Sequence, residues 1–192
     1  MDKEAKKEIS NHLIFSLSVF VITESLWLVT GNFSILNAAL LLFGLIIGTF
    51  IIDTDHLVYW YFLKPSLEES GEAKGLISQK KYKQVLSILS QNHKSHTSLV
   101  FHHFIFQAVL LVVSFFVISS TTSILGAGLV LAMSGHLLVD QFFDLKVNPD
   151  HLKSWLFARS PFSDLPLPHS WLKAYFSFYC LAFLLLIYFF LG

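Results

Sequence analysis

The chain has 192 residues, of which 54% are hydrophobic and only 14% are charged, and its 13 basic and 13 acidic residues cancel to a net charge of zero. An ordinary soluble domain carries about 25% charged residues, and so few charges could not cover the surface of a soluble domain of this length. The 20 Phe exclude disorder, the single cysteine excludes a disulfide scaffold, and the zero net charge gives no attraction to nucleic acid. The composition therefore predicts an integral membrane protein, with membrane lipid and not nucleic acid as its partner.

Five apolar segments are long enough to be membrane-spanning helices, which need about 20 mostly apolar residues. Short polar turns at Gly31–Asn32 and Ser119–Ser123 join the first pair and the second pair of spans into antiparallel hairpins. No small-x-small cleavage site follows the first segment, so we expect a retained helix and not a signal peptide. The sequence predicts an all-α integral membrane protein, a single domain with a bundle of about five transmembrane helices. The predicted spans are about 12–30, 34–52, 98–118, 123–143 and 173–191.

The positions of Lys and Arg predict the orientation of these spans. All thirteen lie before the first span, between the second and third, or between the fourth and fifth, and none lies in a hairpin turn or the C-terminal tail. With five spans these regions share one side of the membrane, which is the cytoplasm by the positive-inside rule. We therefore expect a cytoplasmic N-terminus, an external C-terminus, and cytoplasmic segments at 53–96 and 144–171.

The two cytoplasmic segments are expected to differ in structure. Within the first, Glu68–Gly75 is predicted to be a loop, and Leu76–Gln91 has the pattern of a short amphipathic helix on the membrane surface or packed on the protein. The second contains four of the five prolines and is predicted to be mostly loop.

Three groups of His and Asp residues lie where predicted spans meet the cytoplasm. The second span ends there, the third begins there and the fourth ends there, so the topology brings the groups to one depth. Ionisable side chains at a membrane span are costly and mark candidate functional sites. In the fourth span they recur every fourth residue, which places them on one helix face. The groups are Asp53, Asp55 and His56; His93 and His96; and His136, Asp140 and Asp144.

This combination of imidazole and carboxylate predicts a divalent metal site. Such ligands suit Zn first, and also Mn or Fe, whereas a cysteine-type zinc site lacks its thiols. The set suffices for one or two ions, or for one ion with carboxylates that orient the imidazoles. Asp55 and Asp140 are the expected catalytic carboxylates, one of them as a general base. The predicted metal ligands are Asp53, Asp55, His56, His93, His96, His136 and Asp140.

Other titratable residues are predicted to have lesser roles. His103, seven residues after His96, shares its helix face and is expected to support the site, as is Asp144, while His102 points roughly 100° away and is expected to make a structural hydrogen bond. Glu24 lies near mid-membrane and is expected to form hydrogen bonds inside the bundle, with an ion pathway as the alternative. Surface positions are predicted for His12, His151 and His169.

The motifs Gly48-x4-Asp53-x-Asp55-His56, His93-x2-His96-Thr97-Ser98 and His136-x3-Asp140 resemble the YdjM-like family of bacterial and archaeal inner-membrane proteins. The resemblance covers about residues 44–144 and implies a metal-dependent hydrolase in the plasma membrane. His93 is closer to His96 than is usual in the family, and Lys94 stands where Arg is common. The motifs are also similar to those of helical zinc phospholipases, which by analogy implies a lipid or phosphoester substrate.

We therefore expect a membrane-embedded, metal-dependent hydrolase whose site lies at the cytoplasmic interface. Two other functions remain open at this point. One is an ion or small-solute transporter, although such proteins usually hold their ligands near the midplane. The other is a non-catalytic membrane scaffold with a structural metal.

Overall fold

The computed structural model describes residues 3–192, with the backbone alone at 3–5 and 94. The described chain is helical throughout and contains no strand. Three short elements continue directly from α2, namely η1 Ile52–Thr54, α3 Asp55–Val58 and the π-helical η2 Tyr59–Leu63. A fourth, η3 His93–Ser95, follows α5. The longer helices are α1 Lys3–Thr30, α2 Ile35–Ile51, α4 Glu68–Ser78, α5 Tyr82–Asn92, α6 Phe104–Ser120, α7 Ile124–Val147, α8 Pro149–Leu156 and α9 His169–Leu191.

Four helical stretches are long and apolar enough to cross a membrane, namely Lys6–Thr30, Ile35–Leu63, Ile124–Val147 and His169–Leu191. Helix α6 is the remaining predicted span and is shorter, with 17 residues. It begins at Phe104 and not near residue 98, because the backbone N–H groups of Val100 and Phe101 donate to the carboxylate of Asp55. These N–H groups therefore do not enter a helical hydrogen-bond ladder.

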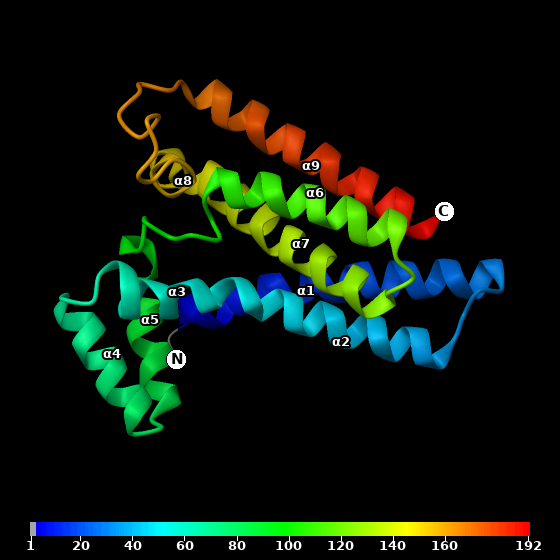
Figure 1. The fold of residues 1–192 in the computed structure, drawn as a ribbon, viewed down its shortest axis with the longest axis horizontal. Coiled ribbons are helices and arrows are strands. Elements are labelled where there is room, and N and C mark those ends of the chain that lie inside the picture. The colour runs from blue at the N-terminus through cyan, green and yellow to red at the C-terminus, as the bar shows by residue number, and fades with distance from the viewer. Residues whose placement is uncertain (1–2) are drawn as a thin grey trace.

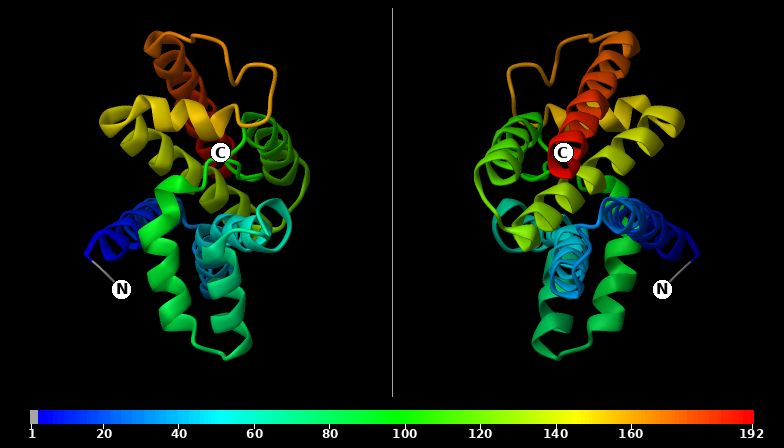
Figure 2. Two further views of the ribbon diagram at one scale, coloured as in Figure 1. Left: turned by 90° about the vertical axis from the view of Figure 1, so that its left-hand side faces the viewer. Right: turned by 90° about the vertical axis from the view of Figure 1, so that its right-hand side faces the viewer.

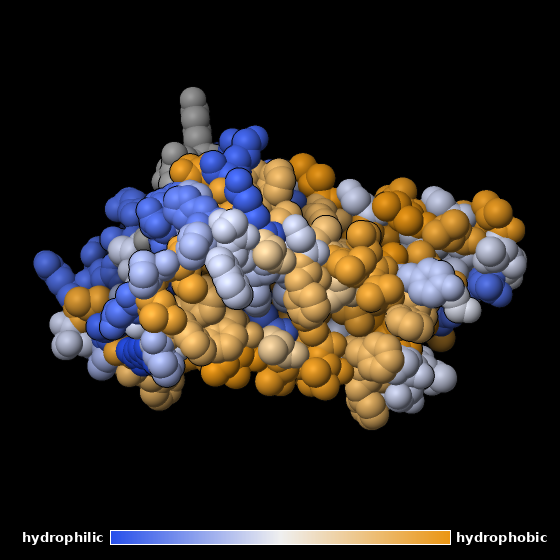
Figure 3. Space-filling view, turned by 90° about the horizontal axis from the view of Figure 1, so that it is seen from above, coloured by the Kyte–Doolittle hydropathy of each residue, from blue (hydrophilic) through white to orange (hydrophobic). Residues whose placement is uncertain are grey.

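The long helices lie roughly along one direction (Figure 1). Helices α1, α6 and α9 run one way and α2 and α7 run the other, so the α1–α2 and α6–α7 turns lie at the end opposite α4, α5 and α8. The space-filling view shows hydrophilic residues gathered at the α4, α5 and α8 end and apolar residues over the remaining length (Figure 3). Many of these apolar side chains are exposed, for example Val21 at 59% and Val112 at 71%. Such a surface is suited to lipid and is characteristic of a membrane protein.

Helices α2 and α7 form the central contact of the bundle through glycines. A Cβ atom on Gly44 or Gly48 would lie 2.3 Å from a backbone oxygen of α7, at Leu125 or Leu129. On the other side of the contact, a Cβ on Gly128 would lie 2.7 Å from the oxygen of Leu41. Small residues that let two backbones approach are typical of helix packing in membranes. This close contact sets the position of His136 relative to α2.

The segments outside the long helices contain more helix than predicted. Glu68–Gly75, expected as a loop, lies in α4, and the expected amphipathic helix at Leu76–Gln91 is divided between α4 and α5 at a turn where Lys80 has φ 58°. The hairpin of α4 and α5 projects from one side of the bundle (Figure 2) and encloses its own apolar core, which includes Trp60, Ala73 and Ile88. Beyond α7, Asn148 caps α8 and Pro149 occupies its first turn, so the proline that suggested a loop begins a helix.

Candidate metal centre

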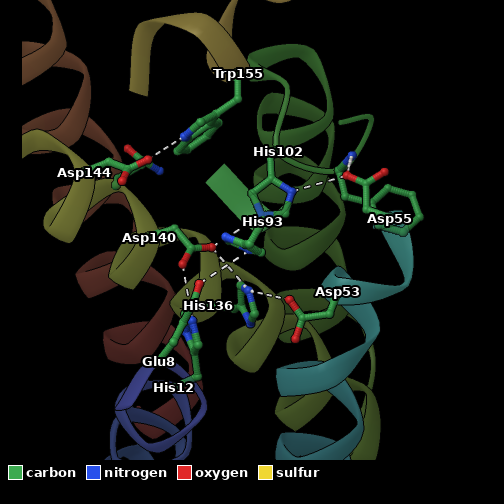
Figure 4. A network of polar contacts seen from close by, with 12 residues as sticks. Glu8, His12, Asp53, Asp55, His93, His102, His136, Asp140, Asp144 and Trp155 are labelled. Atoms are coloured by element: carbon green, nitrogen blue, oxygen red, sulfur yellow. Dashed lines mark hydrogen bonds and ion pairs between the residues drawn. The ribbon is translucent and has the colours of Figure 1, made fainter. Parts of the chain in front are cut away.

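His12, His136 and Asp140 converge at the hydrophilic end of the bundle (Figure 4). His12 Nε2 lies 3.2 Å from Asp140 Oδ1, and His136 Nε2 lies 3.2 Å from Asp140 Oδ2. One ligand atom from each residue lies within 4.8 Å of the others, so the group could hold a metal ion. His136 and Asp140 are one turn apart on α7, and His12 comes from the facing turn of α1. Both imidazoles are buried, with 5% exposure for His12 and 3% for His136.

A backbone carbonyl of α2 orients His136. His136 Nδ1 lies 2.7 Å from Thr49 O. Because a carbonyl can only accept, Nδ1 carries the hydrogen, and Nε2, which faces Asp140, is the nitrogen that could bind a metal ion. This arrangement of a carbonyl behind an imidazole is the usual support of a metal-binding histidine.

His12 is aligned on His136 by ring stacking. The two rings lie parallel, with centroids 3.9 Å apart and an interplanar angle of 3°. Asp53 adds a further carboxylate, with Oδ1 at 3.5 Å from His136 Nε2 and a side chain that is 34% exposed. Asp53 therefore borders the group from its more open side.

Asp55, a predicted ligand and catalytic residue, faces the chain that precedes α6. It is fully buried, and its carboxylate accepts from Val100 N at 3.0 Å and Phe101 N at 2.7 Å, with His102 Nδ1 at 3.2 Å. Three donors occupy its oxygens, so Asp55 holds the 100–102 segment in place and does not join the group of His12, His136 and Asp140.

His102 connects Asp55 to the centre. It was expected to make only a structural hydrogen bond, yet its Nε2 also lies 3.4 Å from Asp140 Oδ2. Burial alone would lower the pKa of His102, but the hydrogen bonds to Asp140 and Asp55 outweigh it and raise the pKa to about 10. Gln107 supports it from behind by donating to the His102 carbonyl at 2.7 Å, and in turn accepts from Tyr175.

His56 and His96 form a separate chain with Glu69. His96 Nε2 lies 2.6 Å from Glu69 Oε1, and His96 Nδ1 lies 2.7 Å from His56 Nδ1. Because the carboxylate accepts from His96 Nε2–H, His96 Nδ1 accepts from His56 Nδ1–H. The remaining nitrogen of His56, Nε2, is buried and has no hydrogen-bond partner within the described part of the chain. Burial lowers the pKa of His96, and the Glu69 carboxylate opposes part of that effect.

The other predicted site residues lie at the edge of the centre or away from it. His93 borders it, with its ring centroid 4.7 Å from that of His56 and Nε2 at 3.4 Å from Glu8 Oε1. Asp144 turns toward His151 and Trp155, which lie 2.6 and 2.7 Å from its Oδ2. His103 caps α6, where its Nδ1 accepts from Ile105 N, and lines a different cavity.

Two cavities meet at the centre. One, of about 310 Å³, has charged and polar residues of α1 and α7 in its wall, with His93, His96 and His102, beside the apolar α7 residues Val139, Phe143 and Val147. The other, of about 300 Å³, lies between α1, α2 and α5 and is lined largely by apolar side chains. Both include Glu8, His12 and His93 in their walls.

Two histidines of the centre were assigned other positions from the sequence. His12 was expected at the surface. The signal that could have identified it is its position at the start of the first predicted span, at the same depth as the three groups of His and Asp residues. His102 was misplaced because a continuous helix from residue 98 puts His103 on the face of His96; the extended backbone at His103 (φ −65°, ψ 142°) breaks that periodicity. His151, also expected at the surface, is bound to Asp144, whereas His169 is exposed as expected.

Two imidazoles and a carboxylate suit a divalent transition metal, and three protein ligands leave a coordination position free, as in catalytic sites. The geometry by itself does not select among Zn, Mn and Fe. Comparison of the chain with protein-family models, with curated proteins and with solved structures gives no match. The site is therefore interpreted from its own residues.

Proposed function

We propose that the chain is a membrane-embedded, metal-dependent hydrolase that cleaves a phosphoester at the cytoplasmic face. The observation that carries the proposal is the group of His12, His136 and Asp140, with His136 oriented by Thr49 O, beside a polar cavity. One ion fits the group, and zinc is the first choice, with Mn or Fe as alternatives.

The residues would divide the chemistry as follows. A divalent ion held by His12, His136 and Asp140 would supply a nucleophilic water at neutral pH and a Lewis acid for a phosphoryl oxygen. Asp53 borders the group without belonging to it, so its carboxylate takes the proton of the attacking water. The water oxygen forms a bond to phosphorus, the bond from phosphorus to the leaving oxygen breaks, and that oxygen receives the proton. Asp55, His102 and Gln107 keep the wall of the site in position.

The proposal includes the predicted topology, with α6 as a fifth span, the N-terminus in the cytoplasm and the C-terminus outside. It also includes the resemblance to the YdjM-like family, and with it a bacterial or archaeal plasma membrane. The thirteen Lys and Arg support the orientation, because all of them lie in the first two turns of α1, between α2 and α6, or at the α7–α9 end.

The test is hydrolysis of bis(p-nitrophenyl) phosphate by the detergent-purified protein, before and after chelation and after reloading with Zn. We expect activity that is lost with chelator, restored by metal, and abolished in His136→Ala. His169→Ala is the matched control, because His169 is exposed and its contact is with Asp150, which is not part of the centre. Activity that survives both chelation and His136→Ala would refute the proposal. Metal that is bound tightly without hydrolysis would instead favour a scaffold with a structural ion.

One observation favours a second candidate, an ion or solute transporter. Glu24 lies within α1 with 8% exposure, and neither carboxylate oxygen has a hydrogen-bond partner within the described residues. The expected hydrogen bond inside the bundle is thus not formed. Proton or cation flux into protein-containing vesicles that disappears in Glu24→Gln would support transport; equal flux in both proteins would exclude this role for Glu24.

A further inference from the structure

The two cavities that meet at the centre differ in chemical character. The first, called the polar cavity below, contains Lys7, Asn11, His102 and Asp140 in its wall, together with apolar side chains of α7. The smaller contains Ile9, Phe50, Leu86 and Leu89, and only its inner end is polar, where it reaches His12, Asp53 and His93. A molecule that occupies both would need a charged part and an apolar part joined at the metal group.

Helix α5 supplies one wall of the apolar slot with a continuous stripe. Tyr82, Leu86, Leu89 and His93 are spaced by four, three and four residues and therefore share one face. Val85 and Ile88, on the neighbouring face of α5, are buried in the core of the α4–α5 hairpin, and Leu89 packs against the edge of that core. Tyr82 and Leu86 lie outside that core, and the stripe runs from Tyr82, 60% exposed, to the edge of the metal centre.

The slot lies between the N-terminal part of α1, the end of α2 and helix α5. Phe50 and Leu86, which line it, are 41% and 44% exposed. A hydrocarbon chain could therefore pass from the membrane into the slot without crossing water. Cavities of about 300 Å³ are at the lower end of the range for small-molecule sites, which suits one chain and not a bulky ring system.

We propose that the slot binds the hydrocarbon chain of an amphiphilic phosphoester from the membrane, with its phosphorylated headgroup in the polar cavity. This rests on the proposed function for the position of the scissile bond, which lies between the two parts, at His12, His136 and Asp140. Lys7 is a cationic residue in the wall of the polar cavity and complements the phosphate charge. Ile9, Leu86 and Leu89 determine the preference for a long chain.

The binding arm of the test uses hexadecyl phosphate with a diazirine at the end of its chain. Photolabelling of the purified protein should place the probe on peptides that contain Phe50, Leu86 or Leu89. Unlabelled hexadecyl phosphate should compete, and inorganic phosphate should not. Leu89→Trp, which fills the slot, should reduce labelling about tenfold or more. Val112→Trp is the control, because Val112 is an exposed apolar residue of α6.

The catalytic arm compares hexadecyl p-nitrophenyl phosphate with the chainless bis(p-nitrophenyl) phosphate. Leu89→Trp should raise KM for the first about tenfold, should raise KM for the second much less, and should leave the metal content unchanged. If neither compound is hydrolysed by the wild type, the proposed function fails while photolabelling still decides the slot. Labelling that is equal in wild type and Leu89→Trp would overturn the inference. A wild-type dimer that Leu89→Trp dissociates would also overturn the inference, because a second copy of the chain would then cover the slot.

Discussion

Asp55 shows how one carboxylate can position a site without being a ligand. It connects the end of α2 with the 100–102 segment through two backbone N–H groups and His102. An amide in its place would present a donor to groups that also donate. Asp55→Asn is therefore expected to destabilise the protein by about 1–3 kcal/mol, which thermal unfolding in detergent would register as a midpoint several degrees lower. Asp150→Asn, at an 83% exposed side chain, should leave the midpoint unchanged.

Glu69 affects the protonation of His96. Burial lowers the pKa of His96, and the Glu69 contact raises it in part, so Glu69→Gln should lower this pKa further. Histidine NMR titration would measure the shift, with Glu68→Gln as the control, since Glu68 is exposed. A pKa that rises or stays constant would contradict the hydrogen-bond chain. Because folding opposes protonation of His96, its contribution to stability is lost as the pH falls below the ordinary histidine value of 6.5.

The sequence could reveal His136 and Asp140 because their four-residue spacing lies on one helix and their proximity needs no tertiary information. The sequence could not reveal which of two neighbouring carboxylates is free to take part in catalysis. Asp53 and Asp55 are two residues apart, yet one borders the centre and the other is occupied by backbone donors. That difference depends on the path of the chain just before α6, which supplies the backbone donors to Asp55.

At the scale of helices, the contact between α2 and α7 is the element that the metal centre most depends on. A methyl group at Gly48 would lie 2.3 Å from Leu129 O, a backbone atom, so the two helices would have to separate. Gly48→Ala should therefore destabilise the protein by about 1–3 kcal/mol. It should also weaken metal binding, because Thr49 O orients His136. Thermal unfolding and metal titration would measure the two effects.

Gly75→Ala is the matched control for this substitution. Gly75 lies in α4 with no atom within 4 Å of the added methyl group, so alanine should be neutral or slightly stabilising. Equal effects of the two substitutions would show that helix propensity, and not the close α2–α7 contact, decides the outcome at Gly48.

Long apolar helices were predictable, because hydropathy over about 20 residues suffices to identify them. The short helices were predictable only in part, because α5 lies in the predicted amphipathic segment, whereas α4 and α8 include residues expected to be loop and are held by packing in two separate apolar clusters. The beginning of α6 was also beyond local sequence rules, because a carboxylate 45 residues earlier in the chain accepts from the N–H group of Val100, four residues before the helix begins.

For the whole molecule, the distribution of charge predicts which end faces the cytoplasm. In a cysteine-free background made by Cys180→Ser, Asn32→Cys and Thr122→Cys should react with a membrane-impermeant maleimide in intact cells. Gly75→Cys and Lys80→Cys should react only in inverted vesicles, because α4 and α5 lie at the opposite end from the two turns (Figure 1). Labelling of Asn32→Cys and Thr122→Cys from opposite sides would contradict the five-span topology.

The metal content of the purified protein tests the central claim most directly. Mass spectrometry of the detergent-purified wild type should find about one divalent transition-metal ion per chain. His12→Ala and His136→Ala should each lose most of it, and His169→Ala should retain it. His12→Ala is the most informative variant, because only the folded chain places His12 beside His136 and Asp140. A full complement of metal in His12→Ala, or none in the wild type after reloading with Zn, Mn and Fe, would contradict the account.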